Sequence, residues 1–311
     1  MNKILVFIVL TAIAFSAICV LTGCFSIGSV TYANSERYSV GDTELTDKIE
    51  NIEIDWPSGS VSVVSHSGNT LLLSEKAEDG ISDDLRVHWW LEGATLHVKF
   101  AASGAAMRLF NTGHKDLTLT VPETLSFHDV IIRAASAEID AGDLVAETLS
   151  VSTASGDVRI ICAASTINLN SASGNIQLTQ NEKAGEVSID TASGEINANI
   201  SHADTAYLES ASGKIKVTAA LVDSLSAKST SGDVSCELED IPTECKLNAV
   251  SGEISLILPD ASDFTANISS TSGEFESDFA LKKDGSTYIC GDGSANIDIE
   301  TTSGDIAIRK K

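Results

Sequence analysis

Apolar and polar residues alternate along the second half of the chain, as they do in β-strands with one buried face. Eight Ser-Gly pairs interrupt this alternation at regular intervals. Their glycines are Gly156, Gly174, Gly194, Gly213, Gly232, Gly252, Gly273 and Gly304. Subtraction gives spacings of 18, 20, 19, 19, 20, 21 and 31 residues between successive glycines. Such a nearly constant period is a repeat signature, and it predicts a stack of similar structural units.

Each repeat is expected to be a coil of two short strands joined at a Ser-Gly corner. Mostly apolar residues stand seven and five positions before each glycine and two positions after it, so the alternation shifts by one residue at the corner. Glycine adopts positive φ without a steric clash, and we expect it to make this sharp turn. The serine before it belongs to the inward-pointing series, so its side chain is expected to face the interior.

A single coil of this kind cannot be stable alone. Each buried aliphatic side chain contributes about 1.5–3 kcal/mol, whereas ordering each residue costs about 1–2 kcal/mol, and a coil has far more residues than buried aliphatics. Stacking is therefore required. The sequence predicts an all-β fold, a β-solenoid or β-helix-like stack of two-strand coils of roughly 19 residues. A sandwich of ordinary hairpins with chance Ser-Gly turns is the alternative.

The solenoid is expected to occupy residues 115–311. The long final spacing allows for an insertion at about residues 278–294, which could lie over the end of the stack. The last strand ends Arg309-Lys310-Lys311, and these charges would protect an exposed sheet edge against pairing with another chain.

An irregular β region at residues 47–114 precedes the repeats. Within it, residues 85–100 indicate a hairpin that turns at Glu92-Gly93. This hairpin would place His88 opposite His97. Two cross-strand histidines could bind a metal, but no third ligand is evident, so two solvated histidines are the simpler interpretation.

Residues 1–24 are expected to anchor the protein in a membrane, followed by a spacer at residues 25–46. Lys3 precedes an apolar stretch from Ile4 to Leu21, and the sequence Leu21-Thr22-Gly23-Cys24 resembles a bacterial lipobox, in which Cys24 would receive lipid. An uncleaved membrane helix is the competing interpretation, since the stretch is about long enough to span a bilayer. Both interpretations place the rest of the chain outside the cytoplasm.

The charge of the chain restricts its partners. Acidic residues exceed basic ones by 44 to 20, which gives a net charge of −24. Nucleic acid is excluded as a partner, because phosphate binding needs clustered Lys and Arg. Four cysteines follow the anchor, and the three at inward positions read as small buried hydrophobic residues. A Cys236–Cys245 disulfide across one coil is possible in an oxidising compartment.

The position after each glycine forms an outward column that is mostly acidic. Asp233, Glu253 and Glu274 within it are candidates for weak Ca²⁺ binding, against the simpler interpretation of a solvated acidic face. No other cofactor is indicated. The repeats lack a nucleophile elbow, a phosphate loop and a zinc-binding His-Glu-x-x-His motif, so no catalytic residue is predicted, and a carbohydrate-active enzyme is a weak third possibility.

The repeated Ser-Gly units behind an irregular strand region and an anchor resemble the DUF4097 family of bacterial surface proteins, described as candidate adhesins. The segments Ile52–Val61 and Leu119-Thr120-Val121-Pro122 also match its layout. The resemblance covers roughly residues 48–309. It implies a non-catalytic adhesin or surface-binding scaffold with an unknown surface protein or glycan as partner. The alternative is a sensor or regulator of cell-envelope stress that acts through a protein partner.

Overall fold

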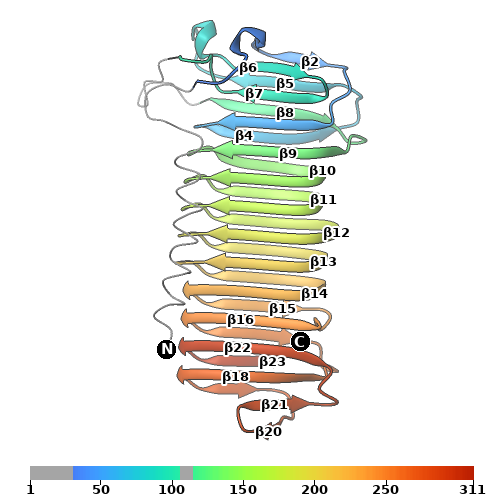
Figure 1. Cartoon of the computed structure of the whole chain (residues 1–311), viewed down its shortest axis with the longest axis vertical. Helices are drawn as coiled ribbons and strands as arrows, with labels where there is room; N and C mark the ends of the chain where they lie inside the picture. Colours follow the sequence, from blue (N-terminus) through green and yellow to red (C-terminus); the bar gives the residue numbers. More distant parts are fainter. Residues whose placement is uncertain (1–30, 106–114) are drawn as a thin grey trace.

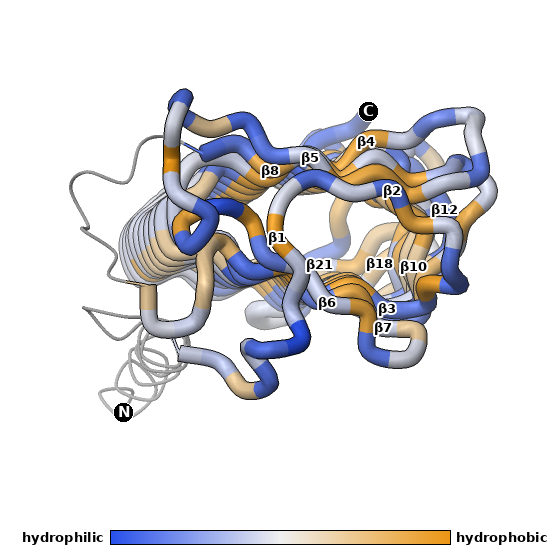
Figure 2. Tube along the Cα trace, turned by 90° about the horizontal axis from the view of Figure 1, so that it is seen from above, coloured by the Kyte–Doolittle hydropathy of each residue, from blue (hydrophilic) through white to orange (hydrophobic). Residues whose placement is uncertain are grey.

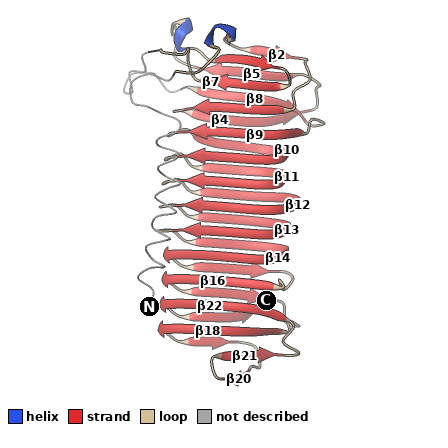
Figure 3. Ribbon diagram, in the orientation of Figure 1, coloured by secondary structure: helices blue, strands red, loops and turns tan. Residues whose placement is uncertain are grey.

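The computed structural model describes residues 31–105 and 115–311. These residues form an all-β fold, which confirms that prediction, with two short 3-10 helices, η1 (Ser35–Arg37) and η2 (Asp83–Leu85), at one end (Figure 3). The strands are β1 (Ser39–Val40), β2 (Thr43–Leu45), β3 (Asn51–Trp56), β4 (Ser60–His66), β5 (Leu71–Lys76), β6 (His88–Glu92), β7 (Thr95–Lys99), β8 (Asp116–Pro122), β9 (Phe127–Ala134), β10 (Glu138–Thr153), β11 (Val158–Ser171), β12 (Ile176–Thr191), β13 (Ile196–Ser210), β14 (Ile215–Ser231), β15 (Val234–Leu238), β16 (Glu244–Ser251), β17 (Ile254–Leu258), β18 (Phe264–Ser272), β19 (Phe275–Ser277), β20 (Lys282–Asp284), β21 (Thr287–Cys290), β22 (Ala295–Ser303) and β23 (Ile306–Lys310).

Each coil contributes one strand segment to each of two faces, and the coils stack along one long axis (Figure 1). We call the face that follows each Ser-Gly pair the post-corner face and the opposite one the pre-corner face. The post-corner order is β2, β5, β8, β4, β10, β11, β12, β13, β14, β15, β17, β23, β19. The pre-corner order is β1, β6, β7, β3, β9, β10, β11, β12, β13, β14, β16, β22, β18, β21, β20. Strands β10 to β14 occur in both, because each continues from one face to the other.

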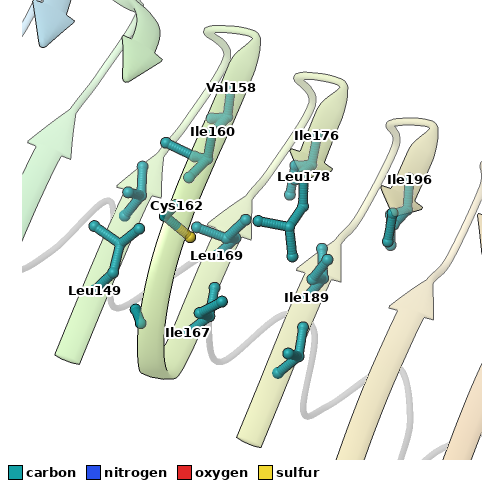
Figure 4. Packing of buried hydrophobic residues seen from close by; sticks show 14 of the residues in the cluster. Leu149, Val158, Ile160, Cys162, Ile167, Leu169, Ile176, Leu178, Ile189 and Ile196 are labelled. Carbon is teal, nitrogen blue, oxygen red and sulfur yellow. The ribbon is translucent and has the colours of Figure 1, made fainter. Parts of the chain in front are cut away.

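The core is a narrow aliphatic column between the two faces. Seen along the stack, the coils superimpose into one flattened ring (Figure 2). Side chains from neighbouring coils, such as Ile160, Ile167 and Leu169, point into the space between the faces (Figure 4). These three residues have no exposed surface, and the positions two after the glycine are buried in seven of the eight repeats. Like residues therefore stack on like residues in parallel register, as the period predicts.

At both ends of the stack, the order of the coils departs from the order of the sequence. β22 and β23 lie between the β16/β17 coil and the β18/β19 coil, although they follow β18 and β19 in the sequence. At the other end, β3 and β4 lie between β7/β8 and β9/β10. The expectation that β23 forms a charged edge was wrong, because β23 has a strand neighbour on both sides. The boundary expected at residue 115 also falls inside the stack, since β8 pairs with β4.

The first described residues are not a free spacer, as we had expected for residues 25–46. Tyr32 donates its hydroxyl hydrogen to the carbonyl oxygen of Ala101 over 2.9 Å, and β1 pairs with β6. The hairpin of β6 and β7 is present as predicted, but its register pairs Trp90 with His97 and His88 with Lys99. The predicted His88–His97 pair is therefore wrong. His88 is buried, and its Nδ1 lies 2.9 Å from the carbonyl oxygen of Arg86.

A buried ion pair lies inside this end of the stack. The Lys115 Nζ atom is 2.5 Å from Glu75 Oε1, and both side chains are almost completely buried. The same ammonium donates to the carbonyl oxygens of Leu85 and Phe100 and lies 4.0 Å from the centre of the Phe100 ring. Burial lowers the pKa of Lys115, and the hydrogen bond with Glu75 opposes this shift.

Replacing Lys115 by Met should destabilise the protein by about 3 kcal/mol, because the Glu75 carboxylate would remain buried without its counter-charge. The free energy of unfolding in denaturant is the measurement. The double variant Glu75→Gln/Lys115→Met should recover most of the loss, since the amide keeps an acceptor for the Val87 N–H, which now donates to Glu75. Equal stabilities of the single and double variants would contradict a role for the pair.

Candidate functional site

The Ser-Gly corners form a continuous ridge along one edge of the stack, built by close contact between backbones. A Cβ atom on Gly213 would lie 1.8 Å from the carbonyl oxygen of Gly194, and one on Gly194 would lie 2.1 Å from that of Gly174. The expected reason for these glycines, positive φ, was wrong for most repeats. Only Gly273 and Gly304 among the eight have positive φ, at 152° and 147°. The other six are required because no side chain fits between stacked corners.

The serine of each Ser-Gly pair is exposed in all eight repeats, which corrects the expectation that it points inward. The inward hydroxyl instead lies three positions before the glycine. Ser210 and Ser229 at this position donate to the glycine carbonyl oxygens of the preceding coil, over 3.2 and 3.1 Å. The sequence contained this signal, because seven of the eight repeats have Ser or Thr there, namely Thr153, Ser171, Thr191, Ser210, Ser229, Ser270 and Thr301.

The outward column after each glycine has a structural role. The Asp157 Oδ1 atom accepts the backbone N–H of Asn175 over 2.8 Å, and Asn175 Oδ1 accepts that of Glu195 over 3.0 Å. Asp233 accepts the N–H of Glu253 in the same way. Short carboxylate and amide side chains therefore tie these corners to the next coil, as Asp305 does by accepting the Glu274 N–H.

The three candidate calcium ligands are not brought together. Asp233 and Glu253 are on adjacent coils, but the coil of Asp305 separates Glu253 from Glu274. Asp233 also pairs with Lys214 Nζ over 2.8 Å, and this hydrogen bond lowers the pKa of the carboxyl group. Within residues 31–105 and 115–311, no three His, Cys, Asp or Glu side chains gather closely enough to hold a metal.

The surface beside the corner ridge carries shallow polar grooves. One of about 310 Å³ crosses four coils of the post-corner face and is lined by Glu138, Asp157, Arg159, Asn175 and Glu195, among others. A second, of about 460 Å³, lies on the pre-corner face near the β20–β21 hairpin and includes Lys246 and Asp298. Each coil of the first groove supplies two or three lining residues, so the surface is suited to extended contact with a long partner.

Asp190 is the acidic residue of the pre-corner face whose titration is most affected by the fold. Burial, reinforced by Glu209 on the next coil, raises the pKa of Asp190 to about 6. The folded state thus binds this proton more tightly than the unfolded state. The ionised carboxylate lowers stability above about pH 6, and this penalty disappears as the pH falls toward 4.

The substitution Asp190→Asn should therefore stabilise the protein at pH 8, by about 1 kcal/mol, and have little effect at pH 4. Thermal unfolding at the two pH values is the measurement. A stabilisation of equal size at both would show that the effect does not come from the carboxylate charge.

The cysteines of the repeats are buried thiols. Cys236 and Cys245 are free and fully buried, and burial raises the pKa of Cys245 to about 12. The possible disulfide between them is not formed in this structure. Cys162 is also free and buried, so these side chains serve as core residues.

The proposed anchor lies outside the described residues. Both the apolar stretch Ile4 to Leu21 and Cys24 precede residue 31, where the description begins. In the described part of the chain, no helix is long and apolar enough to cross a membrane.

Comparison with known proteins gives one family match and several distant structural relatives. The family model Toastrack DUF4097 matches residues 49–309. A candidate lipid-binding protein from Parabacteroides distasonis shares 15% identity, with 87% of this chain and 96% of that chain covered and a TM-score of 0.48. A candidate adhesin from Parabacteroides merdae shares 12% identity over 88% and 96% of the two chains, with a TM-score of 0.43. No curated protein matches this chain.

Proposed function

Because the chain belongs to the Toastrack DUF4097 family, whose model spans residues 49–309, we propose that it is a non-catalytic, extracytoplasmic binding scaffold that is anchored in the membrane and acts as an adhesin. Its partner would be a protein or glycan of a cell surface. The observation that carries this proposal is the shape of the molecule, which has two long sheet faces (Figure 1). The exposed positions of the strands on these faces are mostly polar.

The chemistry of the repeats supports binding rather than catalysis. Catalytic sites need an acid, base or nucleophile that converges with its partners on one point. In the repeats, Asp157, Asn175 and Asp233 accept backbone N–H groups, and their positions follow the coil spacing. Side chains arranged in this way offer many weak contacts to a long partner, and the affinity comes from their number.

The proposed anchor would hold one end of the stack close to the membrane. Tyr32 is fixed to the β7–β8 connection, where its backbone N–H donates to the Ser103 hydroxyl over 3.0 Å. Tyr32 follows Cys24 by only eight positions, and a fully extended chain spans about 3.3–3.6 Å per residue. The β7/β8 end would then lie within about 30 Å of the bilayer, with the rest of the stack free to point away from it.

Binding of the full chain to envelope material tests the proposal. The full chain, reconstituted in lipid vesicles, should bind purified envelope fractions saturably, with and without Ca²⁺, because the acidic candidates do not gather into a site. Absence of saturable binding would overturn the adhesin proposal and favour a regulator of envelope stress that acts through a membrane protein partner.

The anchor is tested separately by labelling cells with a lipid precursor. The wild-type chain should incorporate the label and Cys24→Ala should not. Equal labelling of both chains would exclude Cys24 as the lipidation site, and membrane retention of an unlabelled chain would identify an uncleaved helix.

A further inference from the structure

The coil of β18 and β19 closes one end of the stack, and its outer edge is only partly covered. β21 pairs with β18 at Phe264–Asn267, and the β19 strand pairs with β23 alone. Figure 1 shows β20 and β21 beneath the first half of β18. Among the described strands, none pairs with the outer side of residues 269–277.

The side chains of this coil are less buried than those of the adjacent coil, although Tyr288 of β21 packs against Phe275 with the ring centres 4.7 Å apart. Ile268 and Phe275 are only half-buried, whereas Ile299 and Ile306, which hold the same positions in the adjacent coil, are at most 1% exposed. The run from residue 269 to residue 273 is Ser-Ser-Thr-Ser-Gly and carries no charge. Exposed sheet edges are usually protected by charged side chains, prolines or a covering loop. Residues 269–273 have neither a charge nor a proline, and the charged residues of the edge are Glu274 and Glu276, of which Glu276 pairs with Arg309.

The contacts between adjacent interior coils show which groups a further strand would meet at this edge. Each coil places its glycine directly over the glycine carbonyl oxygen of the preceding coil, and Thr301, three positions before Gly304, donates to the carbonyl oxygen of Gly252 over 3.4 Å. Two positions after the glycine, the Val158 N–H donates to the Asn175 carbonyl oxygen of the following coil over 2.8 Å. At the open end, the corresponding groups are the carbonyl oxygen of Gly273 and the backbone N–H of Phe275.

We propose that residues 269–277 bind an extended segment of a partner protein with the sequence pattern Ser/Thr-x-Ser-Gly followed by an alternation of polar and apolar residues. This segment would add one further coil to the stack through main-chain hydrogen bonds. A second copy of this chain is disfavoured as the donor, because its own Ser-Gly segments are already paired inside its stack and each copy carries a charge of −24. The inference is independent of the membrane anchor and of surface binding.

A fluorescent peptide with the sequence of residues 185–200 of this chain is the probe, because it contains one complete corner with Thr191 and Gly194. It should bind the purified full chain in detergent. Binding should weaken about tenfold in Ser277→Pro, which removes an N–H on the open edge. Ser277→Ala is the matched control: both variants lose the hydroxyl that accepts the Phe279 N–H, but only the proline loses the edge donor.

Two outcomes would overturn the proposal. One is that Ser277→Pro and Ser277→Ala bind the peptide equally well, or that the peptide binds to none of the three proteins, the wild type included. The other is a concentration-dependent dimer that Ser277→Pro abolishes, which would assign the edge to a second copy. Should Ser277→Pro fail to fold, a peptide with Gly194→Val carries the test, because its side chain would clash with the glycine carbonyl beneath it. Undiminished binding of that peptide would contradict the model.

Discussion

Gly213→Ala should destabilise the protein by about 4 kcal/mol or more, among the largest effects of any single substitution. Alanine adds only one carbon, but this Cβ would lie 1.8 Å from the carbonyl oxygen of Gly194 and 2.6 Å from its carbonyl carbon. Both atoms belong to the backbone of the neighbouring coil, so neither can move without separating two corners. Chemical denaturation followed by circular dichroism measures the loss.

Two controls separate this contact from general sensitivity of the coil. Gly185→Ala, at the opposite turn of the preceding coil, should be nearly neutral, because its Cβ would stand 3.6 Å from the Ser165 carbonyl oxygen, an ordinary contact. Lys214→Ala, beside the corner, should have little effect on stability, since Lys214 makes an exposed ion pair with Asp233. If Gly213→Ala had the same free energy of unfolding as these controls, the corners would not be in backbone contact.

Ile215→Asp should be at least as damaging, because it would place an unpaired carboxylate in the aliphatic column. Ile215 is 1% exposed and lies in register with Ile196 and Val234 on the two adjacent coils. The side chain thus contacts apolar neighbours above and below it. We expect loss of the cooperative unfolding transition at neutral pH, with partial recovery in acid, where the carboxyl group takes up a proton.

Lys216→Asp provides the matched control, because the next residue along the strand is exposed. It introduces the same side chain and should change the unfolding free energy by about 0.5 kcal/mol or less. A normal unfolding transition for Ile215→Asp at pH 7 would mean that the position two after the glycine is not interior.

Much of the fold could be predicted from the sequence, because the strands and corners of each repeat depend on residues that are close together in the sequence. The alternation around Ser155-Gly156 and its later copies marked the strands, the buried columns and the corners. The conformation at the corner could not be deduced in the same way. Positive φ and close backbone contact both require glycine, and only the distance between stacked coils, such as that from Gly213 to Gly194, distinguishes them.

The order of the coils was also beyond sequence reasoning. The repeats have nearly the same residue pattern, so the pattern does not determine which coil lies next to which. The coil of Glu274 could stack directly on the coil of Glu253, but in the structure the coil of Asp305 lies between them. That arrangement depends on the 31-residue interval before Gly304, which forms β20 and β21. The calcium hypothesis assumed that successive repeats in the sequence are adjacent coils in the stack, and this does not hold for the repeats of Glu253 and Glu274.

The position of β22 and β23 between β16/β17 and β18/β19 affects how the protein folds during translation. The segment of β18 and β19 leaves the ribosome before β22 and β23 exist, and it carries the same repeat pattern as they do. It can therefore dock on β16 and β17 first, in a register that is almost native. The later segment must then displace it, so we expect the final coils to mature in a slow exchange step after synthesis has passed residue 310.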